Sequence, residues 1–84
     1  MPAIINHFYQ HYRTGEVYEV LGFGYYTESK PLELSVIYQA QYDDPELGAQ
    51  PVFVRPQTMF EEMVTAADGT EVPRFTDVTD AIEA

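Results

Sequence analysis

The stretch LELSVIYQAQY, Leu32 to Tyr42, carries the clearest strand signal in the chain. Its apolar and polar residues alternate with a period of two, which indicates a strand with one buried face. The apolar face carries Leu34, Val36, Tyr38, Ala40 and Tyr42. The opposite face carries Ser35, Gln39 and Gln41, and only Ile37 breaks the alternation. We therefore expect this segment to pair within a β-sheet.

The segments on both sides of this stretch predict a further strand and two connections. EVYEVLGFGYY, residues 16–26, is rich in β-branched and aromatic residues, and Gly22 and Gly24 within it predict a bulge or a bend. TESKPLE, residues 27–33, is typical of a turn. YDDPELGAQP, residues 42–51, contains too much Asp, Pro and Gly to continue a strand, so it predicts a loop.

A third strand and a corner follow the loop. VFVR, residues 52–55, predicts a short strand that Pro56 ends. Because proline disfavours helical backbone in the residue before it, we expect Arg55 to stay extended. Proline also suits the first position of a helical turn, so PQTMF, residues 56–60, predicts a single 3₁₀ turn that redirects the chain.

The sharpest local signal is the pair Asp68-Gly69 within TAADGTEV, residues 65–72, because this pair favours a type I′ hairpin turn. A two-residue loop would pair Val64 with Pro73 in a non-hydrogen-bonded position, where the missing N–H of proline costs the ladder nothing. This reversal would fold the last two strands together, so that a curled sheet encloses the tyrosine side chains.

The register of that hairpin makes one further prediction. It places Glu61 diagonal to Arg74 on the same face, within reach of a long side chain. We therefore expect an ion pair between these two residues, with a contribution of about 0.2–1 kcal/mol if it is exposed.

Composition and charge exclude several classes of partner. The 84 residues are enough for one domain and include fourteen Asp and Glu against four Lys and Arg, for a formal net charge of −10. Nucleic acids and anionic membranes are excluded as partners, because binding them requires many more Lys and Arg. There is no cysteine, no apolar stretch of the roughly 20 residues that a membrane span needs, and no secretory leader. We expect a cytoplasmic protein.

Four elements together resemble the DUF1653 family of small bacterial proteins: HYRTGEVYEVLG, VIYQAQY, VFVRPQTMFEEMV and DGTEVPRF. The resemblance extends from about His11 to Phe75 and implies an SH3-like barrel. The residue patterns agree with it, since they predict a mainly β fold of four to five short antiparallel strands with one 3₁₀ turn near residues 56–60. We divide the chain into an N-terminal extension (1–10), a barrel domain (11–75) and an acidic tail (76–84). The family name denotes unknown function, so the resemblance implies no activity.

The residues available for binding an anion are His11, Arg13, Arg55 and Arg74. In one interpretation, Arg55 and His11 meet at one mouth of the barrel and hold a carboxylate or a phosphate. In the other, each arginine pairs with one of the fourteen acidic residues. An Arg55 side chain that enters an aromatic pocket without a carboxylate in reach would favour the first interpretation.

A second candidate site is an aromatic groove formed by Tyr25, Tyr26 and Phe53. Domains with an SH3-like fold use such surfaces to bind extended, proline-rich peptides. The alternative is that aromatic residues of this chain fill the core, which we expect for Tyr38 and Tyr42 because they lie on the apolar face of their strand.

We recognise no sequence motif for catalysis, metal binding or cofactor binding. His7 and His11 are four residues apart, but no HExxH motif surrounds them. There is no calcium-binding loop, no Ser-His-Asp pattern and no glycine-rich phosphate loop. We assign no catalytic residue, no metal ligand and no cofactor.

Three hypotheses for function follow. The first is a non-enzymatic interaction module with an aromatic surface groove near Tyr25, Tyr26 and Phe53, in which Arg55 gives direction to a bound protein. The second is a domain that binds a small molecule or an anion at Arg55 and His11. The third is a structural homodimer formed through sheet edges, which small sheets are prone to form.

Overall fold

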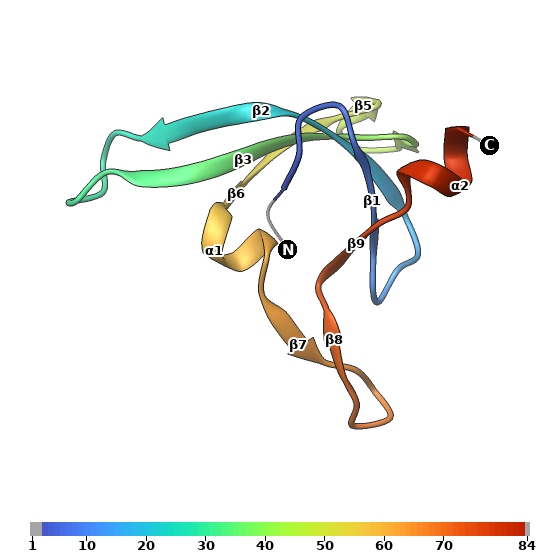
Figure 1. Cartoon of the computed structure of the whole chain (residues 1–84). Coiled ribbons are helices and arrows are strands. Elements are labelled where there is room, and N and C mark those ends of the chain that lie inside the picture. The colour runs from blue at the N-terminus through green and yellow to red at the C-terminus, as the bar shows by residue number, and fades with distance from the viewer. Residues whose placement is uncertain (1–2, 84) are drawn as a thin grey trace.

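The structure, a computed structural model, describes residues 3–83, and these residues form mainly antiparallel β-strands (Figure 1). One sheet has the strand order β6-β3-β2-β1-β9. Its strands are β1 Phe8–His11, β2 Val17–Tyr26, β3 Glu33–Ala40, β6 Val52–Pro56 and β9 Phe75–Asp77. Two small sheets pair β4 Asp43–Asp44 with β5 Gly48–Ala49, and β7 Met63–Thr65 with β8 Glu71–Pro73. The helices are α1 Gln57–Phe60 and α2 Thr79–Glu83.

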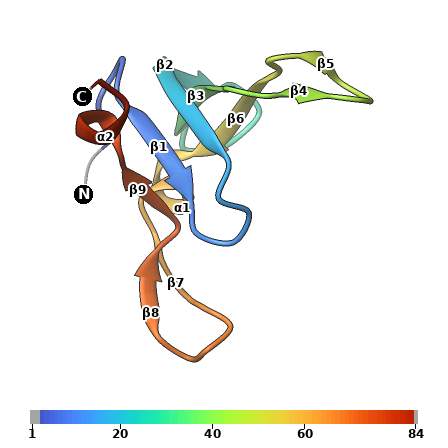
Figure 2. The same ribbon diagram turned by 90° about the vertical axis from the view of Figure 1, so that its right-hand side faces the viewer.

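The five-stranded sheet is open, so the closed barrel expected from the sequence was wrong. Its two edges are β6 and β9, and no pairing joins them among the described residues. The reason lies in the hairpin of β7 and β8. These two strands pair with each other in a sheet of their own, and Figure 2 shows the hairpin projecting away from the five-stranded sheet. It therefore cannot bridge the two edges.

The centre of the sheet follows the sequence prediction. β3 buries Val36, Tyr38 and Ala40, as the alternating pattern predicted. The predicted irregularity in β2 is also present, because the pairing with β3 shifts between Val20 and Gly22. A bulge of this kind bends a strand and increases its twist, which allows the two long strands to curve over the core.

The segment between β3 and β6 is more ordered than the predicted loop. β4 and β5 form a small hairpin, with Asp43 opposite Ala49 and Asp44 opposite Gly48. The carboxylate of Asp44 accepts hydrogen bonds from the backbone N–H groups of Glu46 and Leu47, at 2.8 and 3.0 Å. The turn-forming residues thus build a tight turn within a hairpin, which composition alone does not distinguish from irregular coil.

The corner after β6 differs from the prediction in its helix type. Arg55 is extended within β6, as predicted, and Pro56 is the last residue of that strand. The backbone N–H of Glu61 donates to the carbonyl oxygen of Gln57 at 3.0 Å, four residues earlier. The corner is therefore one turn of α-helix and not a 3₁₀ turn. It brings Phe60 into the core, where this side chain is only 2% exposed.

The hairpin at Gly69 forms, but its register differs by one residue from the prediction. Val64 pairs with Val72, so the loop has three residues and not two. The N–H of Gly69 donates to Ala66, and the N–H of Ala66 donates to Thr70. Gly69 has a φ of +88°, as the left-handed position of a three-residue loop requires. Pro73 now faces Met63, which is still a non-hydrogen-bonded position, as predicted.

The change of register also changes the ion pair. Arg74 now lies opposite Glu62, and its Nη2 is 2.6 Å from the Glu62 carboxylate. The predicted pair with Glu61 was therefore wrong. Glu61 instead accepts hydrogen bonds from the backbone N–H of Ala3 at 2.8 Å and from the side chain of Gln57 at 3.2 Å.

Both ends of the described chain join the main sheet. β1 begins at Phe8, and β9 ends at Asp77 and pairs with β1. These strands include residues that we assigned to the extension and to the acidic tail. The backbone N–H of Phe8 donates to the hydroxyl of Thr79 at 2.9 Å, which attaches α2 to β1. No helix within residues 3–83 is long and apolar enough to cross a membrane.

Candidate functional site

The core is an aromatic cluster with Phe75 at its centre. Phe75 stacks on Phe60 with ring centres 4.2 Å apart, and it makes edge contacts with Tyr18 and Tyr38. Phe53 of β6 continues the cluster beside Tyr38, at 5.8 Å. Four strands and α1 supply these rings, so the cluster joins segments that are distant in the sequence.

Arg55 reaches this cluster from β6. Its Nε donates a hydrogen bond to the hydroxyl of Tyr38 at 3.1 Å, and its guanidinium carbon lies 5.7 Å from the centre of the Phe75 ring. Among the described side chains, residues 3–82, no carboxylate lies within ion-pair distance of Arg55. Its two terminal nitrogens also have no hydrogen-bond partner there. A guanidinium held by an aromatic wall with its terminal nitrogens available is suited to bidentate binding of a carboxylate or a phosphate.

His11 joins the same cluster from the end of β1. Its ring packs edge-on against Phe75 at 5.1 Å, and His11 and Phe75 are direct partners in the sheet. Its Nδ1 accepts a hydrogen bond from the backbone N–H of Arg13 at 3.2 Å, which places the proton of the neutral ring on Nε2. Burial and then the positive charges of Arg55, Arg13 and Arg74 lower the pKa of His11. At neutral pH, the ring is therefore an uncharged hydrogen-bond donor through Nε2.

The arginines differ in the partners that their side chains have. Arg74 is paired, since it binds the Glu62 carboxylate and its Nε donates to the carbonyl of Met59 at 2.9 Å. Arg55 is close to aromatic rings and has no acidic partner among residues 3–82. Three of the four Lys and Arg residues of a chain with net charge −10 thus act on one histidine. We call the region around His11, Arg13 and Arg55, where this positive charge is concentrated, the His11–Arg55 surface.

The predicted aromatic groove divides into two places. Phe53 and Arg55 alternate along β6 with the exposed Val52 and Val54, so Phe53 faces the core cluster. Tyr25 and Tyr26 are the last two residues of β2 and are 64% and 55% exposed. They line a shallow hollow of about 220 Å³, together with residues that include Gly24, Ile37 and Val54. Tyr25 and Tyr26 therefore do not share a pocket with Phe53.

The second histidine has a structural contact. His7 lies just before β1, and its Nδ1 is 2.7 Å from the carboxylate of Asp77 at the end of β9. Partial burial raises the pKa of Asp77, but hydrogen bonds from Thr79 and His7 outweigh it and lower the pKa overall. His7 precedes β1 and His11 is its last residue, so the backbone between them is a strand and not a helical turn. Within the described part of the chain, no cluster of three potential ligands is arranged to hold a metal ion.

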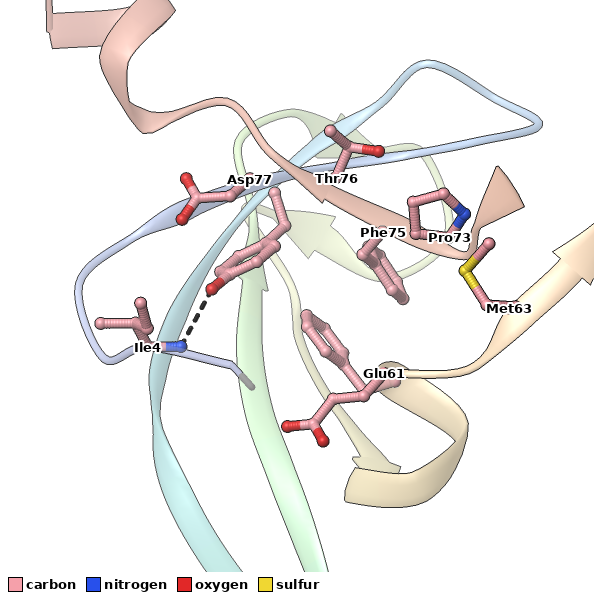
Figure 3. Close-up of a pocket in the computed structure, with 9 residues that line it drawn as sticks. Ile4, Glu61, Met63, Pro73, Phe75, Thr76 and Asp77 are labelled. Carbon is pink, nitrogen blue, oxygen red and sulfur yellow. Dashed lines mark hydrogen bonds between the residues drawn. The ribbon is translucent and has the colours of Figure 1, made fainter. Parts of the chain in front are cut away.

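One feature of the site region was not predicted from the sequence. A cavity of about 410 Å³ lies beside the stacked pair of Phe60 and Phe75, between the segment before β1 and the β7–β8 hairpin (Figure 3). Tyr9 forms part of its wall, and its hydroxyl accepts the backbone N–H of Ile4 at 2.9 Å. Burial raises the pKa of Tyr9. The lining comes from separate segments, so no local pattern in the sequence indicated the cavity.

The open antiparallel sheet and its half-buried arginine define a small β-sheet domain with a candidate anion-binding surface. The chain belongs to the DUF1653 family, whose model is described as a protein of unknown function and matches residues 7–77. This match confirms the resemblance drawn from the motifs and extends it to His7 and Asp77. No curated protein and no solved structure matches the chain significantly.

Proposed function

We propose that this domain is a non-enzymatic binding module for an anionic ligand that carries a carboxylate or a phosphate. The observation that supports the proposal best is the position of Arg55. Its guanidinium rests on the aromatic cluster without an acidic partner among residues 3–82, although the chain contains fourteen acidic residues. An arginine that serves only structure would be expected to pair with one of them.

The neighbouring groups favour the same class of ligand. Nε2–H of His11 and the terminal nitrogens of Arg55 have no acceptor among the described side chains, and Arg13 adds positive charge. The Phe75 ring lies beside the guanidinium, and the hydroxyl of Tyr38 accepts a hydrogen bond from its Nε, so both contacts hold the arginine in place. Charge-assisted hydrogen bonds to such a group contribute about 1.5–3 kcal/mol each. An anion with an aromatic or apolar body would bind best.

The proposal is tested by titration of the ¹⁵N-labelled domain with phenyl phosphate, benzoate and the neutral benzyl alcohol, followed by NMR. We expect the two anions to shift the resonances of His11 and Arg55, and the relative affinities separate a phosphate ligand from a carboxylate ligand. Replacement Arg55→Gln should weaken anion binding by about tenfold or more. Lys30→Gln removes the same charge from the exposed β2–β3 turn and is the matched control. Equal affinities for wild type and Arg55→Gln would refute the proposal.

A second candidate function concerns the hollow at Tyr25 and Tyr26. These exposed rings lie beside Val54, on the outward face of the edge strand β6. An extended, proline-rich peptide would place apolar side chains in the hollow, as peptides do on SH3-like domains. Binding of an oligoproline peptide that is lost in Tyr26→Ala would support this. Light scattering that shows a dimer, dissociated by Val54→Lys, would instead support pairing of two copies through β6.

A further inference from the structure

The cavity beside Phe60 and Phe75 is large enough for a small organic molecule. Its volume of about 410 Å³ lies within the range of about 300–1,000 Å³ that is typical of ligand sites. It is separate from the His11–Arg55 surface, because neither His11 nor any of the arginines lines it. Phe75 is the residue that the two regions have in common.

Most of the cavity wall is apolar. Ile4 forms one side, and Met63 and Pro73 form the side nearest the β7–β8 hairpin (Figure 3). The hydroxyl of Tyr9 lies on the side of Ile4, whose N–H it accepts. Met63 is 55% exposed, so this side is open to solvent and allows a ligand to enter.

The charged groups that line the cavity are both acidic. They are Glu61 and Asp77, and Lys, Arg and His are absent from the lining. In Figure 3 both carboxylates lie on the side of Phe75 that is away from Met63. The hydrogen bonds of Asp77 use both of its oxygens, for His7 and Thr79. Glu61 binds Ala3 and Gln57 through Oε2 alone, so its Oε1 has no hydrogen-bond partner among the described residues.

We propose that this cavity binds a small hydrophobic amine in its ammonium form. The apolar body of the amine lies along the exposed side chains of Ile4 and Met63, and the ammonium group donates to Oε1 of Glu61. Three features select this ligand class over neutral or anionic molecules. The wall combines apolar side chains with carboxylates, basic residues are absent from it, and the net charge of −10 raises the local concentration of cations.

The experiment compares three ligands that share one ring and differ in charge: benzylamine, benzyl alcohol and benzoate. Each is titrated into the full-length ¹⁵N- and ¹³C-methyl-labelled protein at pH 7, and the methyl resonances of Ile4 and Met63 are followed. We expect benzylamine to shift both methyl signals and to bind about threefold to tenfold more tightly than benzyl alcohol. Equal affinities, tighter binding of benzoate at these methyl groups, or unshifted Ile4 and Met63 signals would overturn the proposal.

Variants test the role assigned to Glu61. Glu61→Gln keeps an oxygen for the N–H of Ala3, and it should reduce benzylamine affinity to that of benzyl alcohol. Glu46→Gln makes the same charge change in the exposed β4–β5 turn and should leave the preference intact. Met63→Lys changes a side chain that is 55% exposed, and it should weaken benzylamine binding whether or not Glu61→Gln folds. Unchanged benzylamine affinity in Met63→Lys would contradict the placement of the ligand.

Discussion

Replacement of Phe60 by alanine should remove much of the stability of the domain. Phe60 is 2% exposed and is the only buried residue of α1. It stacks on Phe75 and makes edge contacts with Tyr9 and Tyr38 at 5.4 and 5.3 Å. Burial of a phenylalanine contributes about 1.5–3 kcal/mol, and the cavity left by its removal increases the loss to about 3–5 kcal/mol. A domain of this length has a total stability of about 4–13 kcal/mol, so the variant should be marginal.

Urea unfolding followed by circular dichroism measures this loss, and the protein has no tryptophan to complicate comparison by tyrosine fluorescence. Phe60→Leu should lose less, about 1–3 kcal/mol, because it keeps much of the volume and loses the ring pairs. Met59→Ala on the same helix is the control, since Met59 is 42% exposed and should change stability by no more than about 0.5 kcal/mol. A loss below about 1 kcal/mol for Phe60→Ala, with an unchanged urea dependence, would show that α1 does not anchor the corner as argued.

Three further predictions follow from charged groups. Arg55→Gln should raise the pKa of His11, measured by NMR titration of its ring protons, because a neighbouring positive charge is removed while burial remains; an unchanged pKa would place Arg55 too far away to act. A double-mutant cycle should give a coupling of about 0.2–1 kcal/mol between Glu62 and Arg74, measured by urea unfolding, whereas the predicted pair of Glu61 and Arg74 should show none. The lowered pKa of Asp77 stabilises the fold at every pH above the ordinary pKa of aspartate, near 3.9. This stabilisation is lost as the pH falls through the lower folded-state pKa. The free energy of unfolding should therefore depend less on pH, between pH 5 and pH 2, in Asp77→Asn than in the wild type.

The sequence predicted the strands where a local pattern fixed them. The alternation in β3 and the glycines in β2 specify a face and a bulge within a few residues, and both are found in the structure. The hairpin at Gly69 was also found, but not its loop length. Two-residue and three-residue loops both use Asp-Gly, and the choice depends on the hydrogen bonds of Ala66 and Thr70. One residue of register then decided whether Glu61 or Glu62 binds Arg74.

Features that depend on contacts between distant segments could not be predicted from local sequence patterns. The strand order of the sheet depends on the pairing of β1 with β9, which are separated by most of the chain. The cavity beside Phe75 has the same origin, because Ile4 and Met63 meet only after folding. The location of Arg55 was partly predictable, since its strand position follows from Pro56. The lack of an acidic partner within residues 3–82 could not be predicted, because it depends on where the carboxylates lie in the folded chain.

The strand order has a consequence for synthesis on the ribosome. β1 is translated just before its neighbour β2, but its other neighbour, β9, is translated after all the other strands of the sheet. A nascent chain that ends before Phe75 therefore has Tyr18 and Tyr38 without their central ring, and one side of β1 without a hydrogen-bonded neighbour. The sheet is thus completed only after β9 has left the exit tunnel, and the growing polypeptide needs protection until then.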